Sequence, residues 1–142
     1  MRLLILGAGP LGLLVAEAAQ AAGSYEEIIF LDDQGRKGPD IMGGCGGFPV
    51  FFDGMTDMLP AQETSEDQCF WLEQVNDMGF PLATVVHPDA QVAEDAQLAD
   101  GTAVLAGAVV EAGAVLPQGC ILCEGTRLTA ADRPHVATLF RG

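Results

Sequence analysis

The sequence predicts an α/β N-terminal half domain of the Rossmann-like type, followed by a short left-handed parallel β-helix built from hexapeptide repeats. Two patterns carry this prediction. Near the N-terminus an apolar strand, a glycine turn, a helix and a second apolar strand follow one another, which is the order of a βαβ unit. From residue 86 onward an aliphatic side chain recurs at every sixth position, which is typical of a parallel β-helix.

The composition limits the partners of this chain. It has 142 residues, with 6 Lys and Arg against 20 Asp and Glu, and a formal net charge of −14. Because nucleic acids and anionic membranes are bound mainly through basic side chains, we expect neither as a partner. No apolar run approaches the roughly 20 residues that span a bilayer. The four cysteines show no disulfide framework, so we expect a cytoplasmic protein.

The βαβ unit predicts a nucleotide site. Residues 2–6 form the first strand, residues 13–22 a helix ended by Gly23, and residues 28–31 the second strand. Glycines let a phosphate approach the backbone, the helix N-terminus supplies N–H groups, and an acid about 20 residues further on binds a ribose hydroxyl. The predicted nucleotide-binding residues are Gly7, Ala8, Gly9, Pro10, Leu11, Gly12, Asp32, Asp33, Arg36 and Lys37.

A purely structural interpretation of the same residues stays open. In it, the glycine turn only packs a strand against a helix. Arg36 and Lys37 are then two solvated charges on a mobile, glycine-rich loop of residues 34–47. A full dinucleotide-binding fold needs two βαβ halves, so an NAD-type protein is the weaker alternative.

The rest of the first domain, predicted to span residues 1–80, contains two further elements. Residues 48–52 predict a third strand at a sheet edge, because they include a proline that cannot donate a hydrogen bond. Residues 65–68 resemble a capping box that opens a helix. The apolar face predicted for this helix consists of Trp71, Val75 and Met78.

The second domain, predicted to span residues 81–142, follows the six-residue period. Its aliphatic positions point into a triangular prism, and small residues four positions later fit the corners. Eight hexads, residues 86–133, make between two and three coils and leave an open sheet edge. The tail, residues 134–142, is predicted to act as a lid on this edge. The aliphatic positions are Val86, Val92, Leu98, Val104, Val110, Leu116, Leu122 and Leu128.

Together these features resemble one family. The turn Gly7-Ala8-Gly9, the strand end Phe30-Leu31-Asp32-Asp33, the linker Gly79-Phe80-Pro81 and the hexad entry Val86-His87-Pro88 are similar to those of nucleotide-sugar acetyltransferases of the bacillosamine and sialic-acid type. The resemblance implies that the first domain binds a nucleotide sugar and that the β-helix forms a homotrimer. It also implies that acetyl-CoA lies between neighbouring prisms, and that a histidine of one hexad acts as general base.

The chain departs from the family pattern in three places. Pro10-Leu11 stands in the glycine turn where the family has Gly-His, and no further strand is predicted between Leu59 and Cys69. In the hexad of residues 128–133, Ala130 and Ala131 stand where the resemblance places the catalytic histidine and its acidic neighbour.

Few other side chains offer acid–base or metal chemistry. His135 is the candidate for a displaced catalytic base, whereas the resemblance implies a linker role for His87. Cys120 and Cys123 resemble half of a zinc site, but no second pair accompanies them, so no metal is predicted. We therefore expect a family member that binds a nucleotide or nucleotide sugar and oligomerises, with weak or no acetyl transfer. An active acetyltransferase that uses His135 is the alternative.

Overall fold

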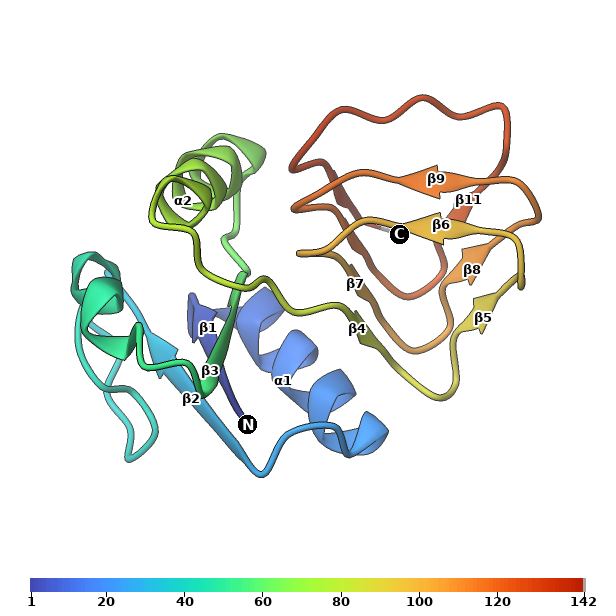
Figure 1. Cartoon of the computed structure of the whole chain (residues 1–142). Helices are drawn as coiled ribbons and strands as arrows, with labels where there is room; N and C mark the ends of the chain where they lie inside the picture. Colours follow the sequence, from blue (N-terminus) through green and yellow to red (C-terminus); the bar gives the residue numbers. More distant parts are fainter. Residues whose placement is uncertain (142) are drawn as a thin grey trace.

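The N-terminal part of the chain is a parallel sheet covered by helices on both faces (Figure 1). The computed structural model describes residues 1–141. The sheet has the order β2-β1-β3, with strands β1 (Arg2–Leu6), β2 (Glu27–Leu31) and β3 (Thr56–Pro60). In β1, Leu3 and Ile5 pack on one face of the sheet, and Leu4 and Leu6 on the other. Burial on both faces explains why this strand is a continuous apolar run.

Helix α1 (Pro10–Ala22) begins earlier than the sequence predicts. Pro10 occupies the first helical position, where a missing N–H costs no hydrogen bond. Gly23 ends the helix in a left-handed conformation, as predicted. The glycine turn is therefore shortened to residues 7–9, and the rest of the predicted turn is the first turn of the helix.

The prediction of a strand at residues 48–52 is wrong. Residues 48–51 belong to the 3-10 helix η1 (Cys45–Phe51), where Pro49 is tolerated and Phe48 is buried against the sheet, and Phe52 caps its end. The third strand is β3, which pairs in parallel with β1. Between Leu59 and Cys69, only Leu59 and Pro60 belong to a strand, which is β3.

The glycine-rich loop after β2 is held along the outer edge of that strand. Phe30 N–H donates to the Asp40 carbonyl at 2.8 Å, and Asp32 N–H donates to the Gly43 carbonyl at 2.9 Å. The loop thereby satisfies backbone groups that an open sheet edge would expose.

Helix α2 (Ser65–Asp77) buries a face different from the predicted one. Its N-cap is Thr64, whose side chain accepts a hydrogen bond from Asp67 N–H. The buried residues are Gln68, Leu72 and Val75, whereas Met78 is 41% exposed and Trp71 is partly buried. Because Gln68 is polar, a search for apolar spacing cannot identify this face.

Gln68 can be fully buried because its side-chain oxygen and nitrogen both have hydrogen-bond partners. Its side-chain nitrogen donates to the carbonyls of Pro60 at 2.8 Å and Gly119 at 2.9 Å. Its side-chain oxygen accepts from Gln62 N–H at 2.8 Å. One side chain thus joins the end of β3, the following loop and a corner of the second domain.

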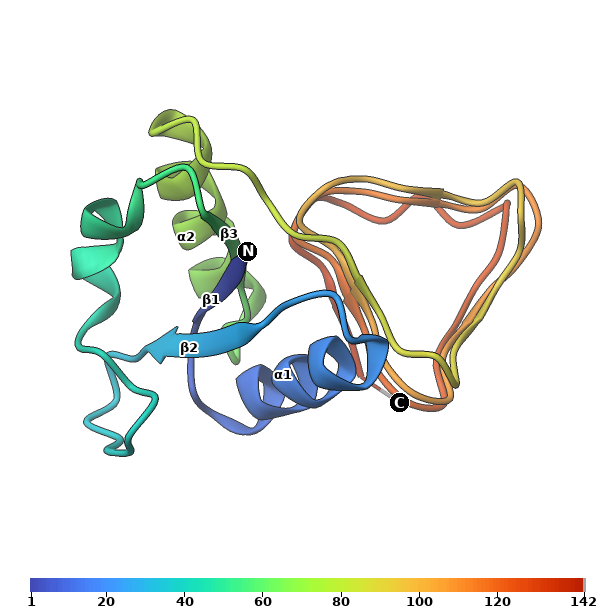
Figure 2. The ribbon, with the colours of Figure 1, turned by 60° about the horizontal axis from the view of Figure 1, so that its bottom comes forward.

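The second half is a left-handed β-helix with a triangular cross-section (Figure 2). Its strands form three parallel sheets, in the orders β12-β10-β7-β4, β11-β8-β5 and β6-β9. All eight predicted aliphatic positions belong to one core cluster, and those from Val104 onward are buried. The strands are β4 (Val85–Val86), β5 (Gln91–Val92), β6 (Gln97–Leu98), β7 (Ala103–Val104), β8 (Val109–Val110), β9 (Val115–Leu116), β10 (Ile121–Leu122), β11 (Arg127–Leu128) and β12 (Leu139–Phe140).

The tail covers the open edge of β10 as an added strand of the prism, and so protects this edge by pairing instead of as a separate lid. β12 pairs in parallel with β10 and places Phe140 beside Leu122. Phe140 continues the six-residue period, with Pro134 at the position between Leu128 and Phe140. A proline cannot donate to the neighbouring strand, and the described residues form no strand there.

The two parts share a core. Val15 and Ala18 of α1 pack in one cluster with Ala103 and Ile121 of the prism. The glycine turn is therefore followed by a helix whose inner face is packed against both parts of the chain. No helix within residues 1–141 is long and apolar enough to cross a membrane.

Candidate functional site

A pocket of about 250 Å³ opens at the carboxyl ends of the three sheet strands, where open α/β sheets bind ligands. We call it the glycine-turn pocket. Five of the predicted nucleotide-binding residues line it: Gly7, Gly9, Asp32, Asp33 and Arg36. Ala8, Pro10, Leu11, Gly12 and Lys37 are not among the lining residues. The remaining lining residues are not predicted from the sequence: Gln34 lies on the loop after β2, and a second wall after β3 consists of Ala61, Gln62, Glu63, Thr64 and Asp67.

Gly7 and Gly12 are required for the packing of the backbone around the turn. Gly7 has a φ of +128°, and a Cβ there would lie 2.3 Å from the Ala61 carbonyl oxygen. A Cβ at Gly12 would lie 1.9 Å from the carbonyl oxygen of Gly7. Both distances are far shorter than any van der Waals contact, so these two glycines permit close packing of β1, α1 and the loop after β3.

Asp32 fastens the glycine turn to the loop after β2. The residue is 8% exposed. Its Oδ1 accepts from Ala8 N–H at 2.9 Å and from Arg36 Nη1 at 3.1 Å, and its Oδ2 accepts from Gln34 N–H at 3.0 Å. Burial raises the pKa of Asp32, but these hydrogen bonds outweigh it and hold the pKa below its usual range. Both oxygens are thus engaged in organising the site.

Asp33 is exposed and also shapes the site. Its Oδ1 accepts a hydrogen bond from Cys45 N–H at 2.9 Å. Burial, followed by the charge of Asp33, raises the pKa of the Cys45 thiol to about 12. Cys45 therefore stays protonated at neutral pH and does not supply a thiolate nucleophile to the pocket.

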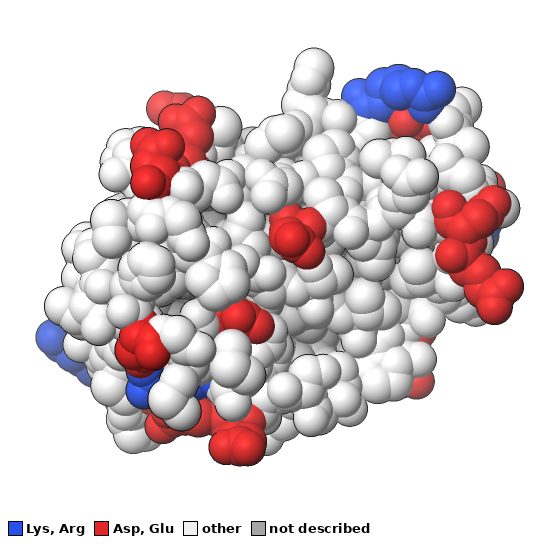
Figure 3. Space-filling view, in the orientation of Figure 1, with Lys and Arg blue, Asp and Glu red and all other residues white. Residues whose placement is uncertain are grey.

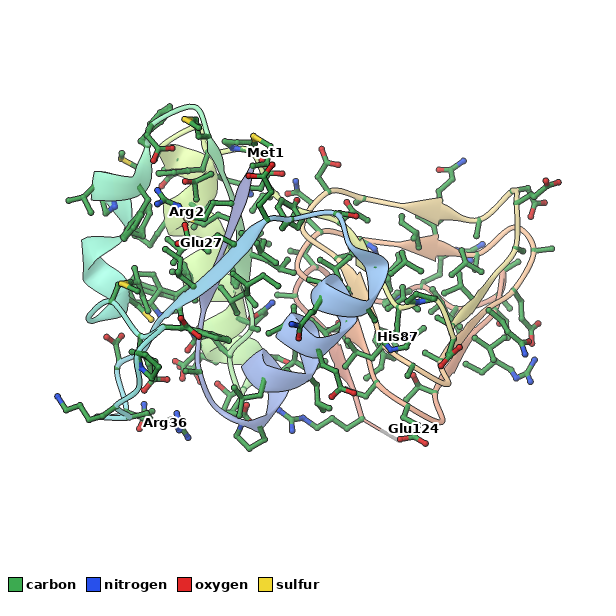
Figure 4. The ribbon with its side chains drawn as sticks, turned by 90° about the horizontal axis from the view of Figure 1, so that it is seen from below. Met1, Arg2, Glu27, Arg36, His87 and Glu124 are labelled. Atoms are coloured by element: carbon green, nitrogen blue, oxygen red, sulfur yellow. The ribbon has the colours of Figure 1, made fainter. Side chains whose placement is uncertain are left out.

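Arg36 is the one cation that lines the glycine-turn pocket within the described residues. Its side chain is 39% exposed, and its Nη2 lies 3.2 Å from the position that a Cβ of Gly9 would take. The guanidinium therefore extends across the turn from the end of β2 (Figure 4). The carboxylates of Asp32, Asp33, Glu63 and Asp67 also line the pocket, so it is acidic overall.

Glu63 caps the start of α1 from the loop after β3. Its Oε2 accepts a hydrogen bond from Leu11 N–H at 2.9 Å. Arg141 approaches from the end of β12, and its Nη2 donates to the Glu63 carbonyl at 2.7 Å. These two contacts connect the pocket to the last coil of the prism.

The corner of the prism at Ala130 carries no histidine. Ala130 and Ala131 are exposed, and a Cβ at Gly113 would lie 3.3 Å from the Ala130 Cβ. The nearby Asp95 accepts a hydrogen bond from Gly113 N–H at 3.1 Å. The side chains present at this corner supply a carboxylate and methyl groups, without an imidazole to act as base.

The two histidines lie elsewhere on the prism. His87 Nδ1 accepts from Asp89 N–H at 2.9 Å, which makes it part of a turn after β4 (Figure 4). His135 is exposed, and its carbonyl accepts from Thr138 Oγ1 at 2.7 Å. Within residues 1–141 the His135 imidazole makes no hydrogen bond or ion pair, so no neighbour orients it as a base.

Few cations of the prism are available to an anionic ligand. Arg127 is paired with Glu111, Arg141 contacts Glu63, and Arg133 donates to carbonyls of its own turn. Acidic side chains outnumber basic ones on the face seen in Figure 3. Among residues 1–141, no cluster of three His, Cys, Asp or Glu is arranged to hold a metal ion.

Comparison with known proteins relates both halves to one group. Residues 2–68 match the family described as PglD N-terminal domain. The structure of the PglB acetyltransferase domain from Neisseria gonorrhoeae, in complex with acetyl coenzyme A, is 31% identical, with a TM-score of 0.84 over 97% of this chain and 66% of that chain. The same domain without the complex is 32% identical, with the same TM-score and coverage.

A second enzyme shows the same fold. A mutant of perosamine N-acetyltransferase from Caulobacter crescentus, in complex with CoA and GDP-perosamine, is 22% identical, with a TM-score of 0.81 over 89% of this chain and 62% of that chain. The chain thus spans less than two thirds of the length of these structures. A search of curated proteins finds no match. Residues 2–68 therefore belong to the family of PglD N-terminal domains, and the chain as a whole is similar to nucleotide-sugar acetyltransferases in the order of its two parts, a PglD-type N-terminal domain and a left-handed β-helix.

Proposed function

We propose that the chain binds a nucleotide or nucleotide sugar in the glycine-turn pocket. The observation that supports this proposal best is the position of the Arg36 guanidinium. The buried, hydrogen-bonded Asp32 holds it beside the glycine turn. Gly9, which lines the pocket, and the exposed carboxylate of Asp33 supply further polar partners. The Caulobacter enzyme, which was solved with GDP-perosamine, supports a nucleotide sugar as the ligand class. A sheet of three strands is half of a dinucleotide fold, so NAD binding has less support.

The binding proposal predicts that Arg36→Gln weakens nucleotide binding while Lys37→Gln does not. The Arg36 guanidinium reaches the pocket, whereas Lys37 lies on the same loop outside the lining. We expect Arg36→Gln to raise the Kd for UDP, GDP or CMP at least about tenfold, as for the loss of one charge-assisted hydrogen bond. Titration calorimetry measures both variants, with NAD and acetyl-CoA as further ligands.

The matched lysine variant separates a local contact from a general effect of charge. Equal weakening in both variants would show that only the net charge of the loop matters. If no nucleotide or nucleotide sugar binds at millimolar concentration, the glycine turn has only a structural role in packing the strand against the helix.

We propose in addition that the chain transfers acetyl groups weakly or not at all. Three observations support this: Ala130 and Ala131 stand at the prism corner, the His135 imidazole is unoriented, and the arginines of the prism have partners. Acetyl-CoA binding has the support of the gonococcal relative, which was solved with acetyl coenzyme A. The active alternative, in which His135 is the base, requires an acidic partner that residues 1–141 do not place beside its imidazole.

We propose a homotrimer as the assembly. Such a short prism leaves strands exposed at its ends, and association is one way for a small core to gain stability. Light scattering at micromolar concentration is expected to give three times the chain mass of 14.8 kDa. A monomer mass under these conditions would contradict the trimer while leaving the binding proposal intact.

A further inference from the structure

Glu63 occupies the place at the start of α1 that a phosphate would need. Its Oε2 accepts from Leu11 N–H at 2.9 Å and lies 3.0 Å from the position of a Cβ at Gly9. The Ala8 N–H of the same turn already donates to Asp32, and Pro10 has no N–H. A phosphate at the turn therefore either displaces the Glu63 carboxylate or binds beside it against charge repulsion.

Glu63 is also held from the opposite side. Arg141 Nη2 donates to its carbonyl at 2.7 Å and lies 3.5 Å from its Oε1. Arg141 directly follows β12, whose Phe140 carbonyl accepts from Cys123 N–H at 2.9 Å. Glu63 thus contacts the first turn of α1 and the residue that directly follows β12.

We infer that Glu63 is an internal competitor for the phosphate of the nucleotide, and that Arg141 couples its release to β12. This inference rests on the proposed function of the glycine-turn pocket. Coupling between two sites is reciprocal. A nucleotide that displaces Glu63 loosens the Arg141 contact, and removal of the Glu63 charge strengthens phosphate binding.

The test compares Glu63→Gln with the wild-type chain. The glutamine keeps an oxygen that can accept from Leu11 N–H, so α1 stays capped while the charge is lost. We expect about tenfold tighter binding of GDP and UDP, within the range of typical coupling between sites. Binding of guanosine and uridine, which lack phosphate, stays unchanged. The control is Glu66→Gln, which removes an exposed carboxylate three residues along the chain that does not line the pocket, and it is expected to change the Kd less than about threefold.

Hydrogen exchange tests the link to β12. In the wild-type chain, saturation with GDP is expected to speed exchange at the Cys123 amide, whose acceptor is in β12. In Glu63→Gln this response to GDP disappears. Exchange that GDP leaves unchanged in the wild-type chain would disprove the coupling.

The outcomes separate this inference from the proposed function. Equal affinity of wild type and Glu63→Gln for GDP overturns the inference and leaves nucleotide binding standing. Binding by Glu63→Gln alone supports the inference, because the wild-type pocket is then closed by its own carboxylate. Absence of binding by both chains at millimolar GDP and UDP overturns both.

Discussion

Val104→Asp is expected to unfold the β-helix. Val104 is fully buried, in the middle strand between Val86 and Leu122 of the neighbouring coils. The prism core there is aliphatic, so a carboxylate would have neither water nor a hydrogen-bond donor. An uncompensated buried charge costs about 3–5 kcal/mol or more, a large fraction of the stability of a small domain. Thermal melting followed by circular dichroism measures the loss.

Val115→Asp is the matched control for this prediction. Val115 is 49% exposed and directly precedes the inward-facing Leu116 in β9. The same substitution on the outer surface is expected to change the free energy of unfolding by about 0.5 kcal/mol or less. Similar melting temperatures for Val104→Asp and the wild-type chain would contradict the inward placement of the hexad residues.

The β-helix could be predicted because one sequence period corresponds to one face of the prism. Every sixth residue must fill the interior, so Val86 to Leu128 reveal the fold without any knowledge of distant contacts. The prediction failed at the tail because Pro134 interrupts the aliphatic series. Phe140 resumes it, which becomes evident only when the residue is placed beside Leu122.

The third sheet strand could not be predicted because distant residues satisfy its polar groups. In β3, Thr56 Oγ1 accepts from Arg2 at 3.2 Å, and Asp57 accepts from the Tyr25 hydroxyl at 2.6 Å. These contacts allow polar residues in a strand that local apolar spacing does not identify. Because β3 was not predicted, the loop after it could not be placed at the pocket. Glu63 and the second wall of the pocket were missed for this reason.

The residues of the first pocket wall could be predicted because a βαβ unit places them by connectivity alone. Gly7, Asp32 and Arg36 follow the ends of β1 and β2, so they meet at one edge of the sheet. The role of each residue in the pocket could be assigned only from its hydrogen bonds and its exposure. The sequence leaves open whether Asp32 or Asp33 faces a ribose. The oxygens of Asp32 hold the turn and Arg36, so Asp33 is the acid with exposure to a ligand.

Acetyl transfer from acetyl-CoA is expected to be slower than about 1 s⁻¹ by at least two orders of magnitude. A positioned general base contributes roughly 10²–10⁴ to such a reaction, and Ala130 cannot accept the proton of an amine or hydroxyl. The paired arginines also leave the phosphates of CoA poorly held, which lowers the effective concentration of the two substrates. A thiol-release assay measures the rate with GDP-perosamine and a panel of other amino- and hydroxyl-sugar nucleotides.

Two histidine variants decide whether any transfer that is observed depends on a displaced base. If the wild-type chain transfers acetyl groups only because it holds the two substrates together, without a general base, His135→Ala and His87→Ala leave the rate unchanged. His87 is the control, because its ring is engaged in the turn with Asp89. Turnover near 1 s⁻¹ or above that vanishes in His135→Ala alone would contradict the proposal of weak transfer. That result would make the His135 imidazole the base. Because residues 1–141 of a single chain place no partner beside this imidazole, a neighbouring chain of the assembly would have to orient it.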